Sequence, residues 1–147
     1  MPVNGLIVAG AVLMVFSTVT KIMKKEGDIM ENFHYEICNR CLIVYILKDL
    51  DHHEVTYLRE KSDRLIDAGD VKNIVFDFEN VDFMDSSGIG LIMGRYKKVL
   101  FIGGRAAVTN VGKSVDRIFK MSGLYKIIEK YDTPACAVEV LEGRRAL

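Results

Sequence analysis

The sequence has no excess of charge and no long run of basic residues. Its 147 residues hold 20 Lys and Arg against 20 Asp and Glu, so the formal net charge is zero, and no run of Lys or Arg exceeds two residues. Sequence-independent nucleic-acid binding needs a basic surface that displaces counterions. We therefore expect no nucleic-acid partner. With 50% hydrophobic and 27% charged residues, the composition is that of a globular domain and excludes a disordered chain.

Cysteine is scarce: Cys38, Cys41 and Cys136 are the three in the chain. An odd number without framework spacing favours reduced thiols and a cytoplasmic protein. Cys38 and Cys41 have C-x-x-C spacing, but the residues around them predict two strands joined by a two-residue turn. The histidines His34, His52 and His53 add no second pair at zinc-ligand spacing. We expect neither a metal nor a cofactor.

An uncharged apolar stretch occupies residues 3–19. It lies near the lower length limit of a membrane-spanning helix, and its lysines follow it, unlike those of a secretory signal. Lys25-Glu26-Gly27 is encodable by a purine-rich ribosome-binding sequence, with Met30 shortly after it. We therefore expect Met30 to be the natural start, with residues 1–29 a translated leader and 30–147 the domain. A packed or pairing helix and a membrane anchor are the alternatives, and only insertion of 1–29 would give a membrane contact.

Strand and helix patterns alternate after Met30, which predicts an α/β fold with a mostly parallel sheet. The expected strands are 33–38, 41–47, 73–78, 105–109 and 127–131; the expected helices are 55–68, 86–102, 115–122 and 134–141. In the long second helix, one apolar stripe is formed by Ile89, Ile92, Met93, Tyr96, Val99 and Leu100. Leu91 lies outside the stripe, and we expect Leu91 and Tyr125 to be surface hydrophobes available to a partner.

The segment Asp85-Ser86-Ser87-Gly88 lies between a strand and this long helix, where function collects in such sheets. Asp and Ser at a helix start accept hydrogen bonds from unpaired backbone N–H groups, so capping alone explains one of them. Two serines and an aspartate before Gly88 and Gly90 exceed what a cap needs. A phosphate on a serine would add roughly two negative charges beside Asp85. We expect it to turn a nearly neutral docking surface into an anionic one.

Three enzymatic motifs are incomplete here. The serine segment lacks the first glycine of G-x-S-x-G and a histidine base. A dinucleotide-binding fingerprint would need glycine where Met93 stands, and the glycine of a phosphate-binding loop is missing before Gly112-Lys113-Ser114. A nucleotide-using α/β enzyme is therefore the weaker hypothesis, and we expect no enzyme activity.

Several blocks, in order, resemble the STAS-domain family of anti-sigma factor antagonists of spore formers. They are Leu50-Asp51-His52-His53, Phe83-Met84-Asp85-Ser86-Ser87-Gly88-Ile89-Gly90, Gly94-Arg95-Tyr96-Lys97 and Met121-Ser122-Gly123-Leu124-Tyr125-Lys126-Ile127-Ile128. The resemblance covers 33–141 and implies a mixed, mostly parallel sheet flanked by about four helices. One departure is Leu47-Lys48-Asp49, where the family usually has Thr-Gly-Glu.

The resemblance implies a non-enzymatic partner switch. Ser86 would be phosphorylated by a serine kinase that is also the anti-sigma factor, and a serine phosphatase would reverse this. The unphosphorylated form would bind the anti-sigma factor and release the sigma factor. The implied partner-binding residues are Asp49, Asp51, His52, Asp85, Ser86, Ser87, Gly88 and Ile89. A STAS module of another partner-switching or sensory scaffold is the nearer alternative.

Overall fold

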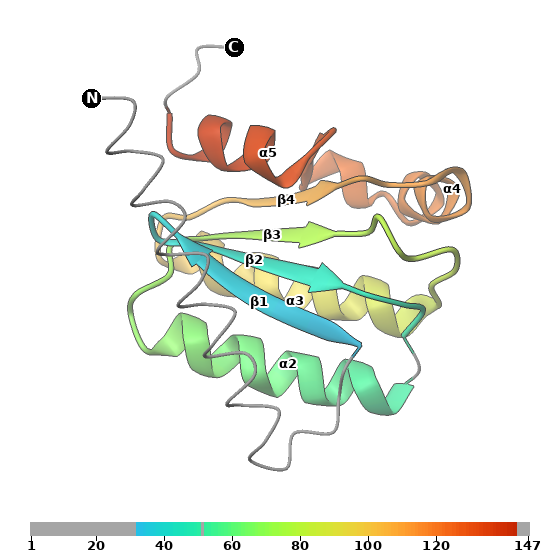
Figure 1. The fold of residues 1–147 in the computed structure, drawn as a ribbon, viewed down its shortest axis with the longest axis horizontal. Coiled ribbons are helices and arrows are strands. Elements are labelled where there is room, and N and C mark those ends of the chain that lie inside the picture. Colours follow the sequence, from blue (N-terminus) through green and yellow to red (C-terminus); the bar gives the residue numbers. More distant parts are fainter. Residues whose placement is uncertain (1–31, 51, 144–147) are drawn as a thin grey trace, which may run out of the picture. The chain divides into compact units, whose positions relative to one another are not determined.

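Five strands form one mixed sheet in the order β1-β2-β3-β4-β5 (Figure 1). β1 pairs antiparallel with β2, and β2 to β5 run parallel. Their bounds are Phe33–Cys38, Cys41–Ile46, Asn73–Asp77, Ala106–Thr109 and Glu129–Tyr131. The computed structural model describes residues 32–50 and 52–143. The predictions about residues 1–29 and Asp51 lie outside these ranges and stay predictions.

The β1–β2 hairpin confirms the interpretation of the cysteine pair. Cys38 and Cys41 are directly opposite each other in the register. The turn residues Asn39 and Arg40 both have positive φ, 50° and 65°, the conformation that a two-residue hairpin turn requires. No disulfide joins any of the three cysteines, all of which lie in the described ranges.

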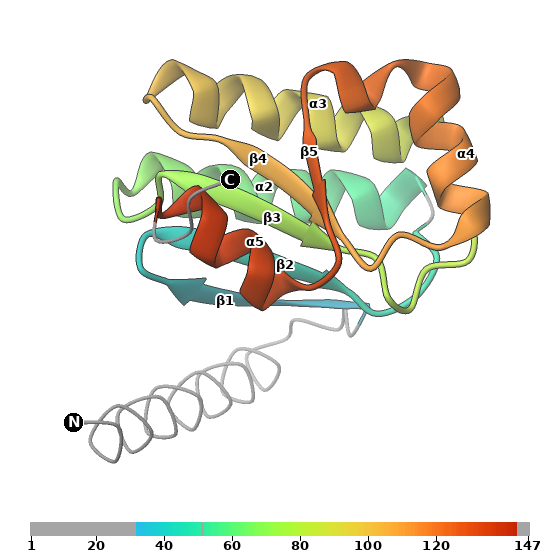
Figure 2. The ribbon, with the colours of Figure 1, turned by 90° about the horizontal axis from the view of Figure 1, so that it is seen from above.

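Helices connect the parallel strands and cover both faces of the sheet. In the described part of the chain they are α2 (His52–Asp67), α3 (Ser86–Phe101), α4 (Lys113–Ser122), the short 3-10 helix η1 (Leu124–Lys126) and α5 (Pro134–Leu141). Figure 2 shows α2 and α3 on one face and α5 on the other. The predicted α/β class is therefore confirmed.

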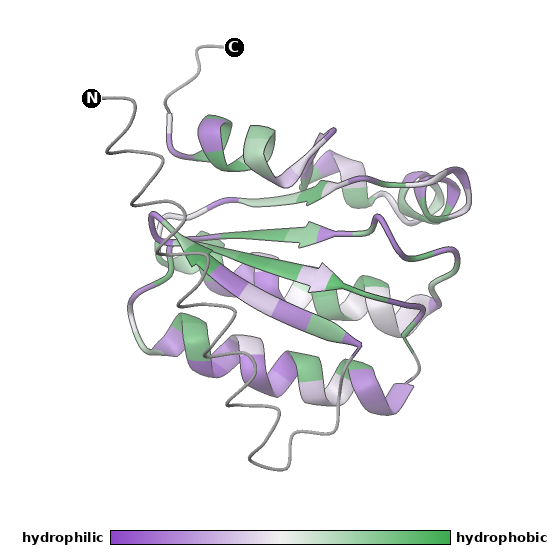
Figure 3. Ribbon diagram, in the orientation of Figure 1, coloured by the Kyte–Doolittle hydropathy of each residue, from purple (hydrophilic) through white to green (hydrophobic). Residues whose placement is uncertain are grey.

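The core follows from alternation along the central strands, which Figure 3 shows as mostly hydrophobic. One set of side chains from the strands packs with α5: Cys41, Ile43, Val75 and Ala107 against Ala137, Val138 and Leu141. The intervening residues are also buried, since β3 has no exposed position. A strand buried on both faces explains why its three central residues, Ile74, Val75 and Phe76, are all apolar.

The apolar stripe predicted for α3 is buried only in part. Ile92 and Val99 of the stripe are fully buried, but Leu100 is 53% exposed, and the buried side of the helix also includes Leu91 and Arg95. The prediction that Leu91 is a surface hydrophobe is wrong, because its side chain is 2% exposed. Tyr125 is half-buried. The buried Arg95 pairs with Asp63 of α2, and this ion pair allows a charged side chain to face inward.

Candidate functional site

The candidate site begins where β3 ends and α3 starts. Figure 1 shows this loop and the start of α2 at the same end of the sheet, the end at which the parallel strands finish. Asp85 is the N-cap of α3, with φ −94° and ψ −174°. Its carboxylate accepts the backbone N–H of Ser87 at 2.9 Å. The local fold is thus a capped helix start, as the sequence predicts.

The two serines of the segment differ in what their hydroxyl groups do. The Ser87 Oγ donates a hydrogen bond to the Asp85 carboxylate. Ser86 is the first residue of α3 and is exposed. Within the described residues, the Ser86 hydroxyl donates no hydrogen bond. Ser86 therefore presents a hydroxyl to solvent, whereas Ser87 is committed to the cap.

The Asp85 carboxyl has a pKa below its ordinary value. The main cause is the hydrogen bond from the Ser87 hydroxyl, and the backbone N–H groups of Ser87 and Gly88 add to it. The charge of His52, the exposed first residue of α2, lowers this pKa further. Both residues are exposed, His52 at the start of α2 and Asp85 at the start of α3.

Asp49 fastens this loop to the end of β2. Its Oδ1 accepts the backbone N–H of Asp82 at 2.8 Å and that of Phe83 at 3.0 Å. Asp49 is the last residue of Leu47-Lys48-Asp49, the segment that departs from the family's usual Thr-Gly-Glu. It therefore links the segment after β2 to the loop after β3. The sequence analysis predicted Asp49 at the site but not this role. Asp82 and Phe83 follow Asp49 by 33 and 34 positions, and a contact over such a separation leaves no periodic pattern in the sequence.

The remaining predicted residues divide between the surface and the interior. Gly88 is buried, and a Cβ on it would lie 2.2 Å from the Met84 Sδ. Gly88 is therefore a packing residue that lets α3 approach the loop. Ile89 is half-buried.

The loop is acidic without any modification. Glu79, Asp82 and Asp85 are exposed in the seven residues before Ser86, and residues 73–94 contain no Lys, Arg or His. The predicted docking surface also includes residues outside this loop, such as Asp49 and His52, so its near-neutral charge stays a prediction. A phosphate on Ser86 would add its charge to an already anionic segment.

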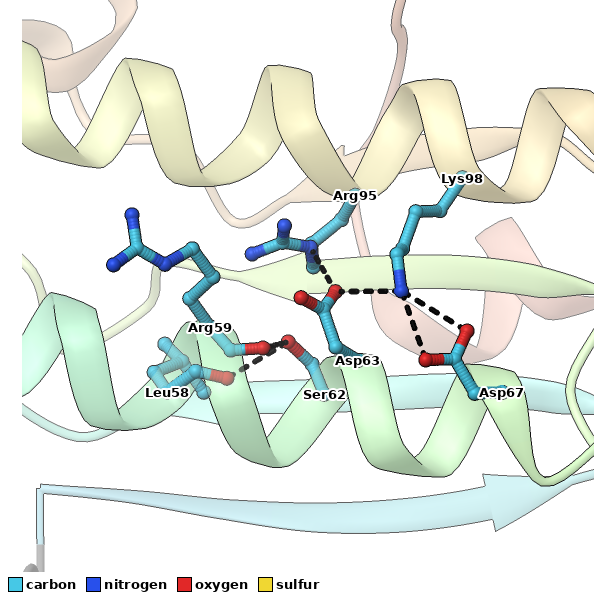
Figure 4. Close-up of polar contacts among 7 residues, drawn as sticks. All are labelled: Leu58, Arg59, Ser62, Asp63, Asp67, Arg95 and Lys98. Carbon is cyan, nitrogen blue, oxygen red and sulfur yellow. Dashed lines mark hydrogen bonds and ion pairs between the residues drawn. The ribbon is translucent and has the colours of Figure 1, made fainter.

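A network of charged residues holds the helix that carries Ser86 against α2. The buried Arg95 pairs through Nε with the Asp63 Oδ1 at 2.8 Å, and Lys98 pairs with Asp67 at 2.9 Å (Figure 4). Burial lowers the pKa of Arg95, and the Asp63 charge opposes that shift. Ser62 on α2 donates to the Leu58 carbonyl at 2.7 Å. This network joins α3 to α2. Its α3 residues, Arg95 and Lys98, lie at least half the length of α3 away from Ser86.

Neither a metal site nor a membrane-spanning helix is found among residues 32–50 and 52–143. Two hollows of about 640 and 290 Å³ lie on the described surface, and neither is lined by Ser86. The larger one is bordered by Arg40, Ile66 and Phe101, at the opposite end of α3.

A protein-family model described as the STAS domain matches residues 32–137, more than half of the chain. The chain belongs to the STAS domain family. The expected fold, a mixed five-stranded sheet with helices on both faces, is the fold of this family. STAS domains of the anti-sigma factor antagonist type are binding proteins rather than enzymes, which agrees with the expectation from the incomplete motifs.

The STAS domain described here has well-matched relatives. An anti-sigma F factor antagonist of Paenibacillus polymyxa is 43% identical over 101 residues, which are 69% of this chain and 86% of the relative. The solved structure of the anti-sigma factor antagonist SpoIIAA in its unphosphorylated form matches with a TM-score of 0.69 and 32% identity, covering 76% of this chain and 96% of that one. The phosphorylated form of SpoIIAA from Bacillus matches with a TM-score of 0.62 and 31% identity, covering 73% and 96%.

Proposed function

We propose that this STAS domain is a cytoplasmic anti-sigma factor antagonist that is switched by phosphorylation of Ser86. In the unphosphorylated state it binds an anti-sigma factor that is also a serine kinase, and this binding releases the sigma factor. Phosphorylation of Ser86 ends the binding, and a serine phosphatase restores it. The relatives support this role, since they are named antagonists and one was solved in both phosphorylation states.

The observation that carries the choice of Ser86 is the difference between the two hydroxyl groups. A phosphoacceptor must present its oxygen to the kinase, and Ser86 is exposed while the Ser87 hydroxyl donates to Asp85. Modification of Ser87 would also remove the donor that its cap carboxylate accepts. The adjacent serine is therefore a cap residue, and the exposed one is the acceptor.

Electrostatics explains how one phosphate ends the binding. A phosphoserine at position 86 carries roughly two negative charges, next to the exposed carboxylates of Asp82 and Asp85. Docking would have to remove these charges from water together, and an unpaired buried charge costs several kcal/mol. The fold need not change, because Ser86 is on the surface.

The proposed docking surface consists of the exposed side chains at this end of the sheet. It includes Asp49, His52, Asp85 and Ser86, with Ile89 at its margin. Asp51 remains part of the proposal and lies outside the described residues. Ser87 and Gly88 contribute through the cap and through close packing.

Phosphopeptide mapping tests the proposal. The chain, a Ser86→Ala variant and a Ser87→Ala variant are incubated with ATP and the anti-sigma F factor of Paenibacillus polymyxa, whose antagonist is 43% identical to this chain. We expect one phosphate on the unaltered chain and on Ser87→Ala, located at Ser86, and none on Ser86→Ala. A phosphate located at Ser87, or no phosphate on any chain, would contradict the assignment. Repeating the reaction with an anti-sigma-B factor distinguishes a module of another partner-switching system.

A further inference from the structure

Phe83 is the one large apolar side chain of its loop that faces solvent. Phe78, Val81 and Met84, in the same loop, are each at most 4% exposed, whereas Phe83 is 61% exposed. A loop that buries its other apolar residues leaves this ring outside, three residues before Ser86. An aromatic ring at this place is the type of residue that supplies most of the binding energy in protein interfaces.

The backbone that carries the exposed ring is held by hydrogen bonds. The Phe83 N–H donates to the Asp49 carboxylate at 3.0 Å, and the Asp82 N–H donates to the same oxygen at 2.8 Å. Val81 N–H closes a turn onto the Phe78 carbonyl at 3.0 Å. Because these hydrogen bonds tie down the loop backbone, we expect less conformational entropy to be lost on association than with an untied loop.

We propose that Phe83 is the apolar anchor of the switch surface and that it inserts into an apolar pocket of the anti-sigma factor, with Asp49 as its positioning residue. This inference rests on the proposed function, since the ring is continuous with the surface around Ser86. Asp49 acts through the loop: its carboxylate is committed to two backbone N–H groups and sets where the ring points. Ser86 follows Phe83 by three residues and is also exposed, so we expect a phosphate on Ser86 to obstruct docking of the ring.

The test compares two exposed phenylalanines on the same molecule. Phe101 is 92% exposed and ends α3, a helix of 16 residues that begins at Ser86, so it lies about 22 Å along the helix from Ser86. Phe83→Ser and Phe101→Ser each remove one exposed ring with little effect on the core. Binding to the anti-sigma F factor of Paenibacillus polymyxa is measured by calorimetry with the unphosphorylated full chain, and thermal unfolding checks that both variants are folded.

We expect Phe83→Ser to weaken binding by about 10-fold or more and Phe101→Ser to change it by less than about 2-fold. Equal weakening by both variants, or no weakening by Phe83→Ser, would overturn the inference while the unaltered chain still binds. A failure of the unaltered chain to bind would overturn the proposed function and this inference with it.

Asp49 variants separate positioning from direct contact. Asp49→Asn keeps an oxygen that accepts the two N–H groups, whereas Asp49→Ala removes it. We expect Asn to retain most of the affinity and Ala to lose about as much as Phe83→Ser, with little further loss when both changes are combined. If Asn and Ala weaken binding equally, and their effect adds to that of Phe83→Ser, Asp49 contacts the partner through its charge and the positioning role is wrong.

Discussion

The Ser87 hydroxyl and the Ser87 backbone N–H both donate to the same carboxylate oxygen of Asp85. This pair caps α3 and commits one of two adjacent serines to structure. The other, Ser86, is exposed at the first position of the helix. A single local interaction thus separates the residue that holds the helix from the residue that carries the proposed switch.

Removing the cap should destabilise the domain by a measurable amount. Asp85→Ala should lower the free energy of unfolding by about 1 kcal/mol, since the Ser87 N–H loses its acceptor, and Asp85→Asn should cost less because asparagine also caps. Urea denaturation monitored by circular dichroism measures both. Equal losses for Asn and Ala would show that charge rather than capping is what Asp85 supplies.

The same carboxyl group gives the domain a pH-dependent contribution. Because the folded pKa of Asp85 lies below its ordinary value of 3.8, its stabilising contribution is fully present above pH 3.8 and is lost as the pH falls through the folded pKa. The difference in stability between the unaltered chain and Asp85→Asn should therefore shrink below pH 3.8. A difference that grows on acidification would contradict the assigned direction.

Two glycines at the start of α3 should respond oppositely to alanine. A Cβ at position 88 would lie 2.2 Å from the buried Met84 Sδ, whereas a Cβ at position 90 has no neighbour within 4 Å. Gly88→Ala should destabilise the fold by about 1–3 kcal/mol, and Gly90→Ala should stabilise it by about 0.5–1 kcal/mol through helix propensity. Thermal unfolding of the two variants side by side is the measurement, and a destabilised Gly90→Ala would show that this helix start is more crowded than described.

The charged contact between α2 and α3 offers another matched pair. Asp63 faces the buried Arg95, and its side chain is 26% exposed, whereas the side chain of Asp67 is 65% exposed. Asp63→Ala should cost about 2 kcal/mol because it leaves Arg95 without its counter-charge. Asp67→Ala should cost less than about 0.5 kcal/mol, as expected of an exposed pair. Chemical denaturation compares them, and similar costs would mean that Arg95 finds another partner.

The three thiols should fall into two classes of reactivity. Burial raises the pKa of Cys41 from 9.0 to about 12, and its side chain is fully buried, while Cys38 and Cys136 are partly exposed. An aromatic disulfide reagent at pH 8 should modify Cys38 and Cys136 in the folded chain and Cys41 only after denaturation. Mass spectrometry of the modified peptides assigns each site, and rapid labelling of Cys41 would contradict its burial.

The sequence predicted the fold wherever its signals were local. The Asn39-Arg40 turn, the apolar central residues of β3 and the capped start of α3 each depend on neighbouring residues, and all three are found in the structure. The sequence-based predictions failed where contacts between residues far apart in the chain decide the structure. Leu91 is buried although it lies outside the predicted stripe of α3, and Asp49 accepts hydrogen bonds from residues that follow it by 33 and 34 positions.

For the candidate site, the family resemblance already singled out Ser86, and that assignment stays a prediction. The geometry adds what the sequence did not contain: the Ser87 hydroxyl donates to Asp85, and Gly88 is buried against Met84. The exposed ring of Phe83 gave no signal, because an apolar residue next to a buried strand is ordinarily expected to be buried itself.

The most direct test of the proposed switch is the affinity of the anti-sigma F factor of Paenibacillus polymyxa for this chain in its two states. Calorimetry with the unmodified chain and with the chain phosphorylated at Ser86 measures it, with Ser86→Ala and Ser86→Asp as non-switching controls. We predict binding by the unmodified chain and by Ser86→Ala, and a loss of at least about 100-fold on phosphorylation, which corresponds to about 2.7 kcal/mol. Equal affinity of the phosphorylated and unmodified chains, or tight binding by Ser86→Asp, would contradict the account.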